Sequence, residues 1–261
     1  MRLQSSLPLV GAIFAAAASF ASAQVNFDFS STPSPAFTTA GSTWTLNTTA
    51  GTYSTSYTAI STTSTAAITQ SSYGGAASSA LDFTLSSTFT LNSIGASNSN
   101  TIGLGFLGSD AAFTNGYLVD ISRSGTGGAT FRIVEFNSGI ATVISTATVS
   151  GLTLTAATTY TISLGSTYID TNSDLVDDSL SISASFFQGS TLLSSVNTTD
   201  NTSQSGTNFG YRLRTASSGA GIDTSFDNFT LSTGAIPEPS TYAALAGLSM
   251  LGLAIVRRRR A

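Results

Sequence analysis

Several residue types on which most enzymes and metal sites depend are absent or rare in this 261-residue sequence. It contains no histidine, no cysteine and no lysine, and glutamate occurs only twice. The absence of histidine excludes a Ser-His-Asp triad, the usual zinc ligands and the commonest general base. The absence of cysteine excludes disulfides, so the chain has to be stabilised by a buried core.

Positive charge is scarce in the body of the chain, residues 24–233. Eleven aspartates and one glutamate outnumber four arginines there, which gives a net charge of −8. The arginines are Arg123, Arg132, Arg212 and Arg214. Nucleic-acid binding needs several convergent cations to neutralise phosphates. The composition therefore predicts that nucleic acid is not a partner.

The shortage of glutamate also bears on glycan cleavage, which normally requires two carboxyl groups that face each other. Glu238 lies in the C-terminal segment, and Glu135 lies in a strand-like run where it is expected to face solvent. The sequence therefore favours a non-enzymatic protein. A glycan hydrolase remains the less favoured alternative, and it would need two aspartates such as Asp82 and Asp120 as its acid pair.

Alternation of apolar and polar residues is the dominant pattern of the body. Leu81, Phe83, Leu85, Phe89 and Leu91 share one parity and are interleaved with serine and threonine. This period of two is typical of half-buried strands, and no comparable helical stripe is present. The same alternation recurs in Ile102-Leu104-Phe106, Tyr117-Val119-Ile121, Tyr160-Ile162-Leu164, Leu180-Ile182-Phe186 and Phe209-Tyr211-Leu213. The pattern predicts one all-β domain over residues 24–233, an antiparallel β-sandwich of the jelly-roll type.

Aromatic residues in the first part of the body raise the possibility of sugar stacking. Trp44 shares a parity with Leu46, which favours burial in the core. Tyr53, Tyr57 and Tyr73 lie in a Ser/Thr/Gly-rich region of weak pattern and are better candidates for exposed aromatics. No sugar-binding residue follows from this pattern.

One acidic segment has the composition of a cation site. Its carboxylate and amide side chains are Asp170, Asn172, Asp174, Asp177 and Asp178. Their opening spacing matches calcium loops, in which alternate side chains converge on one ion. An EF-hand is excluded, because Leu175 and Ser181 replace its glycine and its last glutamate. The alternatives are a calcium site and a polar hairpin turn between the strands 160–164 and 180–186.

The N-terminus has the parts of a signal peptide. Met1-Arg2 is positively charged at its start, an apolar stretch runs from Leu7 to Phe20, and Ala21-Ser22-Ala23 offers a small-x-small cleavage site. A signal helix over residues 1–23 is therefore predicted, with the mature chain beginning at Gln24. This pattern predicts export.

The C-terminal segment, residues 234–261, combines three features. A Pro237-Glu238-Pro239 tripeptide is followed by an apolar run and by a basic cluster, Arg257, Arg258, Arg259 and Arg260. The apolar stretch Tyr242–Val256 has 15 residues, whereas a full membrane span needs about 20. We expect a short transmembrane helix whose arginines stay cytoplasmic. It would serve as a transient or permanent single-pass anchor.

These C-terminal features resemble the PEP-CTERM sorting signal of bacteria that make exopolysaccharide. Ile236-Pro237-Glu238-Pro239-Ser240-Thr241-Tyr242 agrees with the usual run of that family, and Arg257 to Arg260 match its basic end. The resemblance implies processing by a transpeptidase-like exosortase, with Pro237, Glu238, Pro239 and the arginines as the sorting residues. It also implies delivery to the cell envelope, the cell surface or the extracellular matrix.

The body is similar to concanavalin-like or laminin-G-like jelly rolls. The segments that carry the similarity are Leu81–Leu85, Ile102–Leu107, Gly116–Asp120, Thr159–Leu164 and Phe226–Leu231. Families of this fold include glycan-binding domains, adhesive modules and glycoside hydrolases, so the similarity implies architecture more than activity. The leading hypothesis is a protein that binds or scaffolds exopolysaccharide. A structural coat protein without a specific ligand is the alternative.

Overall fold

The computed structural model describes residues 24–57, 63–69, 82–94, 100–124, 128–152, 154–169, 179–202, 204–215 and 221–233. All regular structure within these ranges is β-strand. No helix in these ranges is long and apolar enough to cross a membrane. The expected signal helix, 1–23, and sorting segment, 234–261, lie outside them, so the domain boundaries stay predictions.

The strands form two antiparallel sheets. Sheet A contains β1 (Gln24–Phe27), β3 (Trp44–Asn47), β4 (Thr52–Tyr57), β6 (Phe83–Ile94), β11 (Thr158–Ile169), β12 (Ser179–Gln188), β13 (Thr191–Asp200) and β15 (Ile222–Thr233). Sheet B contains β2 (Thr38–Ala40), β5 (Thr63–Thr69), β7 (Thr101–Gly108), β8 (Gly116–Ser124), β9 (Gly128–Asn137), β10 (Ile140–Ser150) and β14 (Asn208–Arg214).

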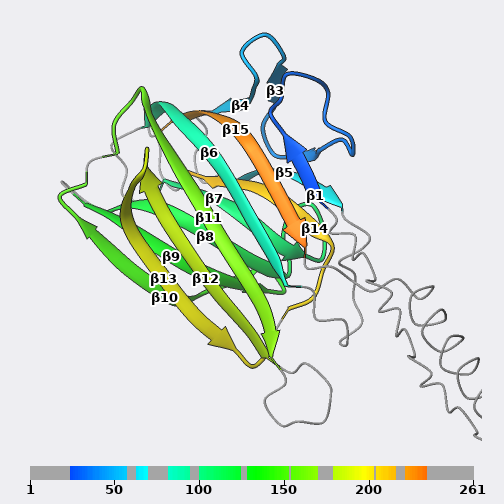
Figure 1. Ribbon diagram of the computed structural model, residues 1–261, viewed down its shortest axis with the longest axis vertical. Helices are drawn as coiled ribbons and strands as arrows, with labels where there is room; N and C mark the ends of the chain where they lie inside the picture. The colour runs from blue at the N-terminus through cyan, green and yellow to red at the C-terminus, as the bar shows by residue number, and fades with distance from the viewer. Residues whose placement is uncertain are drawn as a thin grey trace, which may run out of the picture. The chain divides into compact units, whose positions relative to one another are not determined.

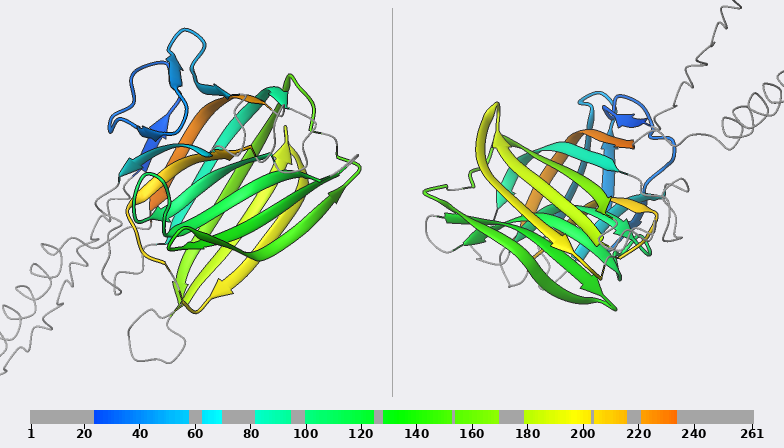
Figure 2. Two further views of the ribbon diagram at one scale, coloured as in Figure 1. Left: turned by 180° about the vertical axis from the view of Figure 1, so that it is seen from behind. Right: turned by 60° about the horizontal axis from the view of Figure 1, so that its bottom comes forward.

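The sheets pack face to face as two layers (Figures 1 and 2). Sheet A runs in the order β13-β12-β11-β6-β15-β4-β3, with β1 paired to β15. Sheet B runs in the order β10-β9-β8-β7-β14-β5-β2. Strands from the first and the second half of the body therefore pair in the middle of each sheet, as β6 does with β15 and β7 with β14. The predicted all-β antiparallel sandwich is confirmed.

The alternation in the sequence identifies the inner faces correctly. Phe83, Leu85, Phe89 and Leu91 are all buried between the sheets, while the serines and threonines that alternate with them mostly face outward. Ser87 is the exception on the inner parity, and its hydroxyl lies 3.0 Å from the buried Tyr211 hydroxyl. Each sheet thus contributes one apolar face to a shared core, as expected for aligned sandwiches.

The core is rich in aromatic rings, and Trp44 belongs to its margin. Trp44 is half-buried, and its indole Nε1 donates a hydrogen bond to Ser64 Oγ at 2.9 Å. Its ring stacks on Tyr53 and Tyr211, with centroids 5.1 and 5.9 Å apart. Together with Leu46 it packs against the core, which confirms the expected inward orientation of this strand.

The expectation that Tyr53 is exposed is wrong. Only 8% of Tyr53 is exposed, and burial raises its pKa to about 12. It pairs with Leu46 on one side and Phe226 on the other, so its register places it in a core-facing row. The weak alternation around Tyr53 in the sequence gives no sign of the two strands, β3 and β15, that pair with it. Tyr73 and the side chain of Tyr57 lie outside the described part of the chain.

Candidate functional site

A row of charged side chains crosses the outer face of sheet B. On β8, Val119 and Ile121 face the core, so Asp120 between them faces outward. The pairing registers align Arg212 of β14 with Gly103 of β7, Gly103 with Asp120, and Asp120 with Arg132 of β9. Four adjacent strands thus bring these residues into one line.

Asp120 and Arg132 form a bidentate ion pair in this row. Arg132 Nε donates to Asp120 Oδ1 at 2.8 Å, and Nη2 donates to Oδ2 at 2.7 Å. The Asp120 side chain is 2% exposed, whereas that of Arg132 is 25% exposed. Burial raises the pKa of Asp120, opposed by the hydrogen bonds and charge of Arg132 and by the charges of Arg212 and Arg214. The buried Asp120 carboxylate therefore fixes Arg132, one of the three arginines whose charges act on it.

Gly103 makes the close spacing of this row possible. A Cβ atom at Gly103 would lie 2.3 Å from the Val119 carbonyl oxygen and 2.8 Å from Asp120 Cβ. Contacts this short are not found for real Cβ atoms, so a side chain here would force the strands apart. The glycine leaves room on the outer face between Arg212 and Asp120.

Aromatic and aliphatic side chains complete this outer face. The guanidinium Cζ of Arg212 lies 4.2 Å from the centroid of the Phe136 ring, within range of a cation–π interaction. Phe136 packs with Leu118 and Val134 in a small cluster separate from the main core. Phe113, from the β7–β8 connection, covers the spaces left by Gly105 and Gly108. The face is therefore packed as well as charged.

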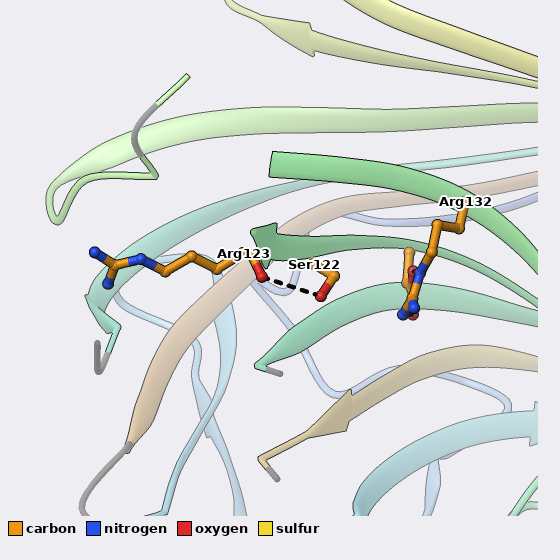
Figure 3. Close-up of polar contacts among 4 residues, drawn as sticks. Ser122, Arg123 and Arg132 are labelled. Atoms are coloured by element: carbon orange, nitrogen blue, oxygen red, sulfur yellow. Dashed lines mark hydrogen bonds and ion pairs between the residues drawn. The ribbon is translucent and has the colours of Figure 1, made fainter. Parts of the chain in front are cut away.

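Three of the four body arginines gather here. Arg214 lies on the same side of β14 as Arg212 and is exposed. Arg123 is the exception, since it shares the parity of Ile121, and Figure 3 shows its guanidinium directed away from Arg132. We call Asp120, Arg132, Arg212 and Arg214 the arginine face. Its four side chains carry a net charge of +2 on a body whose net charge is −8.

The outer face of sheet A has a different composition. Most outward side chains on its three neighbouring strands β6, β11 and β12 carry a hydroxyl, and Asn92, Ile169 and Phe187 near the strand ends are the exceptions. The hydroxyl-bearing residues are Thr84, Ser86, Thr88, Thr90, Thr159, Thr161, Ser163, Thr167, Ser181, Ser183 and Ser185. We call them the hydroxyl face. Its rows are in register across the strands, as in Thr90–Thr159 and Ser86–Ser163–Ser185.

A hollow of about 280 Å³ opens on this hydroxyl face. Gly165 lies in register between Thr84 and Ser183, so one position of the hydroxyl lattice lacks a side chain. Thr167, Ser181, Ser232 and Asp82 also line the hollow. Asp82 is exposed. The site is thus a polar depression with hydroxyls around it and one negative charge.

The predicted calcium segment, Asp170 to Asp178, lies outside the described residues. Its flanks, Ile169 and Ser179, are paired as the ends of β11 and β12, so the segment connects two neighbouring antiparallel strands. Within the described ranges, no three histidine, cysteine or acidic side chains are grouped so as to hold a metal ion. Calcium binding by Asp170, Asn172, Asp174, Asp177 and Asp178 stays a prediction.

The expectation for Glu135 is corrected by the fold. Glu135 is half-buried instead of solvent-facing, and its Oε1 accepts a hydrogen bond from Gln204 Nε2 at 2.7 Å. Nearby, Tyr117 donates to Asp200 Oδ2 at 2.7 Å and accepts from the Gln204 backbone N–H at 2.9 Å. The connection between β13 and β14 brings these distant residues against Glu135. They form a network that holds this connection against sheet B.

The suggested acid pair, Asp82 and Asp120, does not come together. Asp82 lines the hollow on the outer face of sheet A, and Asp120 lies in the arginine face on the outer side of sheet B. Packed sheets are about 10 Å apart, so groups on the two outer faces are separated by more than the sheet spacing. This pair therefore cannot flank one glycosidic bond.

The arginine face and the hollow were not predicted from the sequence. The outward parity of Arg132 and Arg212 could have been noted, because each lies between two core-facing residues. Their separation of 80 positions gives no local sign that they share a face. Gly165 carried a weaker signal, as a glycine inside an alternating strand pattern.

Comparison with known proteins identifies the C-terminal segment. Residues 235–260 match the PEP-CTERM protein-sorting motif, and this range includes Pro237, Glu238, Pro239 and Arg257 to Arg260. The sorting motif is thereby confirmed, although these residues lie outside the described structure. A signal of this kind implies export, association with the cell envelope and processing by an exosortase-type enzyme. No curated protein sequence matches the chain.

Solved structures similar to the sandwich have diverse titles. One is the CBM2 module of the evolved Dit protein of Lactobacillus casei BL23 phage J-1, at 12% identity and a TM-score of 0.49, covering 81% of this chain and 95% of that one. Another is metal-free lectin I-B4 from Griffonia simplicifolia, at 13% identity and 0.49, covering 81% and 99%. A third is alginate lyase Aly36B, at 13% identity and 0.44, covering 80% and 96%. At sequence identities and TM-scores this low, the activities of these proteins cannot be assigned to this chain.

Proposed function

We propose that this chain is an exported, non-catalytic protein of the cell envelope or extracellular matrix that binds or scaffolds exopolysaccharide. Acidic stretches of the polymer lie across the arginine face. The observation that carries the proposal is the gathering of Arg132, Arg212 and Arg214 on one outer face of an otherwise acidic body. The PEP-CTERM motif at 235–260 supports the proposed location.

Arginine is suited to this ligand class. Its planar guanidinium binds a carboxylate through two parallel hydrogen bonds, and the carboxylates of uronic acids offer that geometry. Asp120 already fixes Arg132 in a defined orientation, so less conformational entropy is lost when a ligand arrives. Arg214, which is exposed, extends the positive surface along β14. Each contact is weak, and affinity comes from repeated carboxylates along one chain.

The proposal that the protein is not an enzyme rests on its acids. Histidine is absent, Asp82 and Asp120 lie on different faces, and Glu135 is hydrogen-bonded by Gln204. Incubating the full chain with exopolysaccharide should release no new reducing ends. Cleavage that is lost in an Asp120→Asn variant would overturn this part of the proposal.

Binding is tested with the full chain, purified in mild detergent, on the producing organism's exopolysaccharide. Anion exchange separates that polymer into acidic and neutral fractions, each of which is immobilised. We expect retention on the acidic fraction, with at least a tenfold loss in Arg212→Ala together with Arg214→Ala. Retention on neither fraction would favour the alternative, a coat protein without a specific ligand.

The same columns test the predicted calcium site. If Asp170, Asn172, Asp174, Asp177 and Asp178 hold calcium that organises the glycan site, a chelator should release the bound protein, and added calcium should restore it. Unchanged retention in chelator would leave the segment as an ordinary polar turn. Buffer from which magnesium, but not calcium, has been omitted is the control, and it should leave the protein bound to the column.

The sorting role is tested separately. Deletion of residues 236–261 should abolish retention at the envelope and release a folded protein into the medium, because the motif and its apolar run are then missing. Fractionation of cells and medium measures this. Continued retention of the truncated protein at the envelope would show that the body has an anchor of its own.

A further inference from the structure

Gly165 differs from the other glycines inside strands because packing does not require it. At Gly103, Gly105 and Gly210, an added Cβ would lie within 2.5 Å of backbone or ring atoms of neighbouring residues. At Gly165 it would meet only Ser183 Oγ, at an ordinary contact distance of 3.5 Å. A glycine inside a strand weakens it and often marks a place where a ligand approaches the backbone closely.

The surroundings of Gly165 define the chemistry of such a ligand. Thr84 and Ser183 flank it in its own row, and Thr167, Ser181 and Asp82 lie beside it. Hydroxyls both donate and accept hydrogen bonds, as the hydroxyls of a sugar ring do. The exposed Asp82 carboxylate accepts two donors and would repel an acidic sugar. The lining therefore fits a neutral sugar, and not the acidic residues that suit the arginine face.

The size of the hollow agrees with a small polar ligand. Its volume of about 280 Å³ is just below the range of roughly 300 to 1,000 Å³ for small-molecule sites, so it suits one sugar residue and not a larger ligand. Its floor is the strand itself at Gly165, so a flat ring can approach the backbone. The hydroxyl rows continue on both sides along β6 and β11, which gives a polymer further hydrogen-bonding partners.

We propose that the hollow at Gly165 binds a neutral sugar residue, so that the protein has glycan sites on both outer faces and bridges two polysaccharide chains. The bridging rests on the proposed function, since it also needs the arginine face. The two faces belong to different sheets, and the whole core lies between them. A single molecule can therefore hold two chains apart by the thickness of the sandwich, which is the geometry of a cross-link.

The first test uses the full chain in mild detergent and the immobilised neutral fraction of the exopolysaccharide. Gly165→Tyr fills the hollow without a backbone clash, and we expect it to weaken retention at least tenfold, equivalent to two or three lost hydrogen bonds. Asp82→Asn changes an exposed side chain and should weaken retention several-fold. Thr45→Tyr, on β3 at the other edge of sheet A, is the matched control and should bind as the unchanged protein does.

The outcomes separate the two proposals. No retention of the unchanged protein on the neutral fraction, or equal retention of Gly165→Tyr, would overturn the neutral-sugar site whatever happens on the acidic fraction. If the unchanged protein is retained on the neutral fraction but not on the acidic fraction, only the arginine-face proposal is overturned. Unfolding curves of Gly165→Tyr and Asp82→Asn establish that each variant is folded.

Bridging has a direct readout. Beads that carry the acidic fraction should capture fluorescently labelled neutral fraction only when the protein is added. Gly165→Tyr should bind the beads normally and capture no label. Capture of label by Gly165→Tyr at the level of the unchanged protein would contradict a bridge through the hollow.

Discussion

The two outer faces of this sandwich differ although their inner faces contribute to one core. Sheet A presents short hydroxyl side chains over β6, β11 and β12, with a hollow at Gly165. Sheet B presents arginines, a buried carboxylate and aromatic rings, packed around glycines. The same alternation that builds a core thus leaves every second residue free to create two chemically distinct surfaces.

The difference extends to how each face is built. On sheet B, Phe113 lies over Gly105 and Gly108, and Arg212 lies over Phe136, so the outer face is itself a packed layer. On sheet A, neighbouring hydroxyls contact each other, as Thr90 and Thr159 do at 2.8 Å, and this pair is exposed. Substitutions should therefore be costly on sheet B and tolerated on sheet A.

The largest effect is expected from Arg132→Ala. It leaves the buried Asp120 carboxylate without its bidentate partner, which typically costs about 3 to 5 kcal/mol of unfolding free energy. Urea unfolding at pH 7 measures this. Arg214→Ala, at an exposed position on the same face, should change stability by no more than about 0.5 kcal/mol. Equal effects of the two substitutions would mean that the ion pair does not stabilise sheet B.

The cost of Arg132→Ala should depend on pH. Burial raises the pKa of Asp120 above its value of 3.8 in the unfolded chain. The contribution of Asp120 to stability is therefore fully present below pH 3.8 and is lost as the pH rises through the higher folded pKa. Removing Arg132 raises that pKa further, so the variant should approach the unchanged protein on acidification. Parallel unfolding curves from pH 7 to pH 4 test this, and a constant difference would contradict it.

Two glycine substitutions, one on each outer face, should have effects of intermediate size on stability. Gly103→Ala places a Cβ 2.3 Å from the Val119 carbonyl oxygen and should destabilise the protein by about 1 to 3 kcal/mol. Gly165→Ala has room on sheet A and should be neutral or stabilising by up to about 1 kcal/mol. Thermal unfolding of both variants measures the contrast. A similar loss of stability in both variants would contradict the difference in packing between the outer faces of sheets A and B.

The smallest effect concerns salt. Binding of the acidic fraction to the arginine face should weaken several-fold between 50 and 500 mM salt, because exposed charges are screened. Binding of the neutral fraction to the hollow should hardly change over this range, since hydrogen bonds between hydroxyls carry no net charge. Retention on the two columns measures both. Equal salt sensitivity would mean that both fractions bind the same face.

Local patterns accounted for much of the fold. The parity of Phe83, Leu85 and Phe89 predicts the inner side of β6 without knowledge of its neighbouring strands, and the parity of Trp44 and Leu46 predicts their inward orientation in the same way. The expected exposure of Tyr53 is wrong because the other residues of its strand, β4, are mostly serine and threonine, which give no sign of a buried face. Its burial depends on Leu46 and Phe226, which the register brings beside it.

The two candidate sites, the arginine face and the hollow at Gly165, cannot be predicted from local sequence patterns. Arg132 and Arg212 belong to strands separated by two others in sheet B, and only the registers of β14, β7, β8 and β9 bring them into one row. The hollow likewise requires Thr84, Gly165 and Ser183 to be in register on three strands. Sequence alone cannot supply these registers, because a shift by two residues keeps every parity and changes every neighbour.

The sequence by itself determined the all-β class, the acidic balance of the body, the absence of histidine chemistry and the sorting motif at 235–260, because each depends on residue type and short-range spacing. The tertiary structure alone decided which outward residues share a face. It buried Asp120 beside Arg132 and left Gly165 open, since strand order and register are set by closure of the whole sandwich around one core.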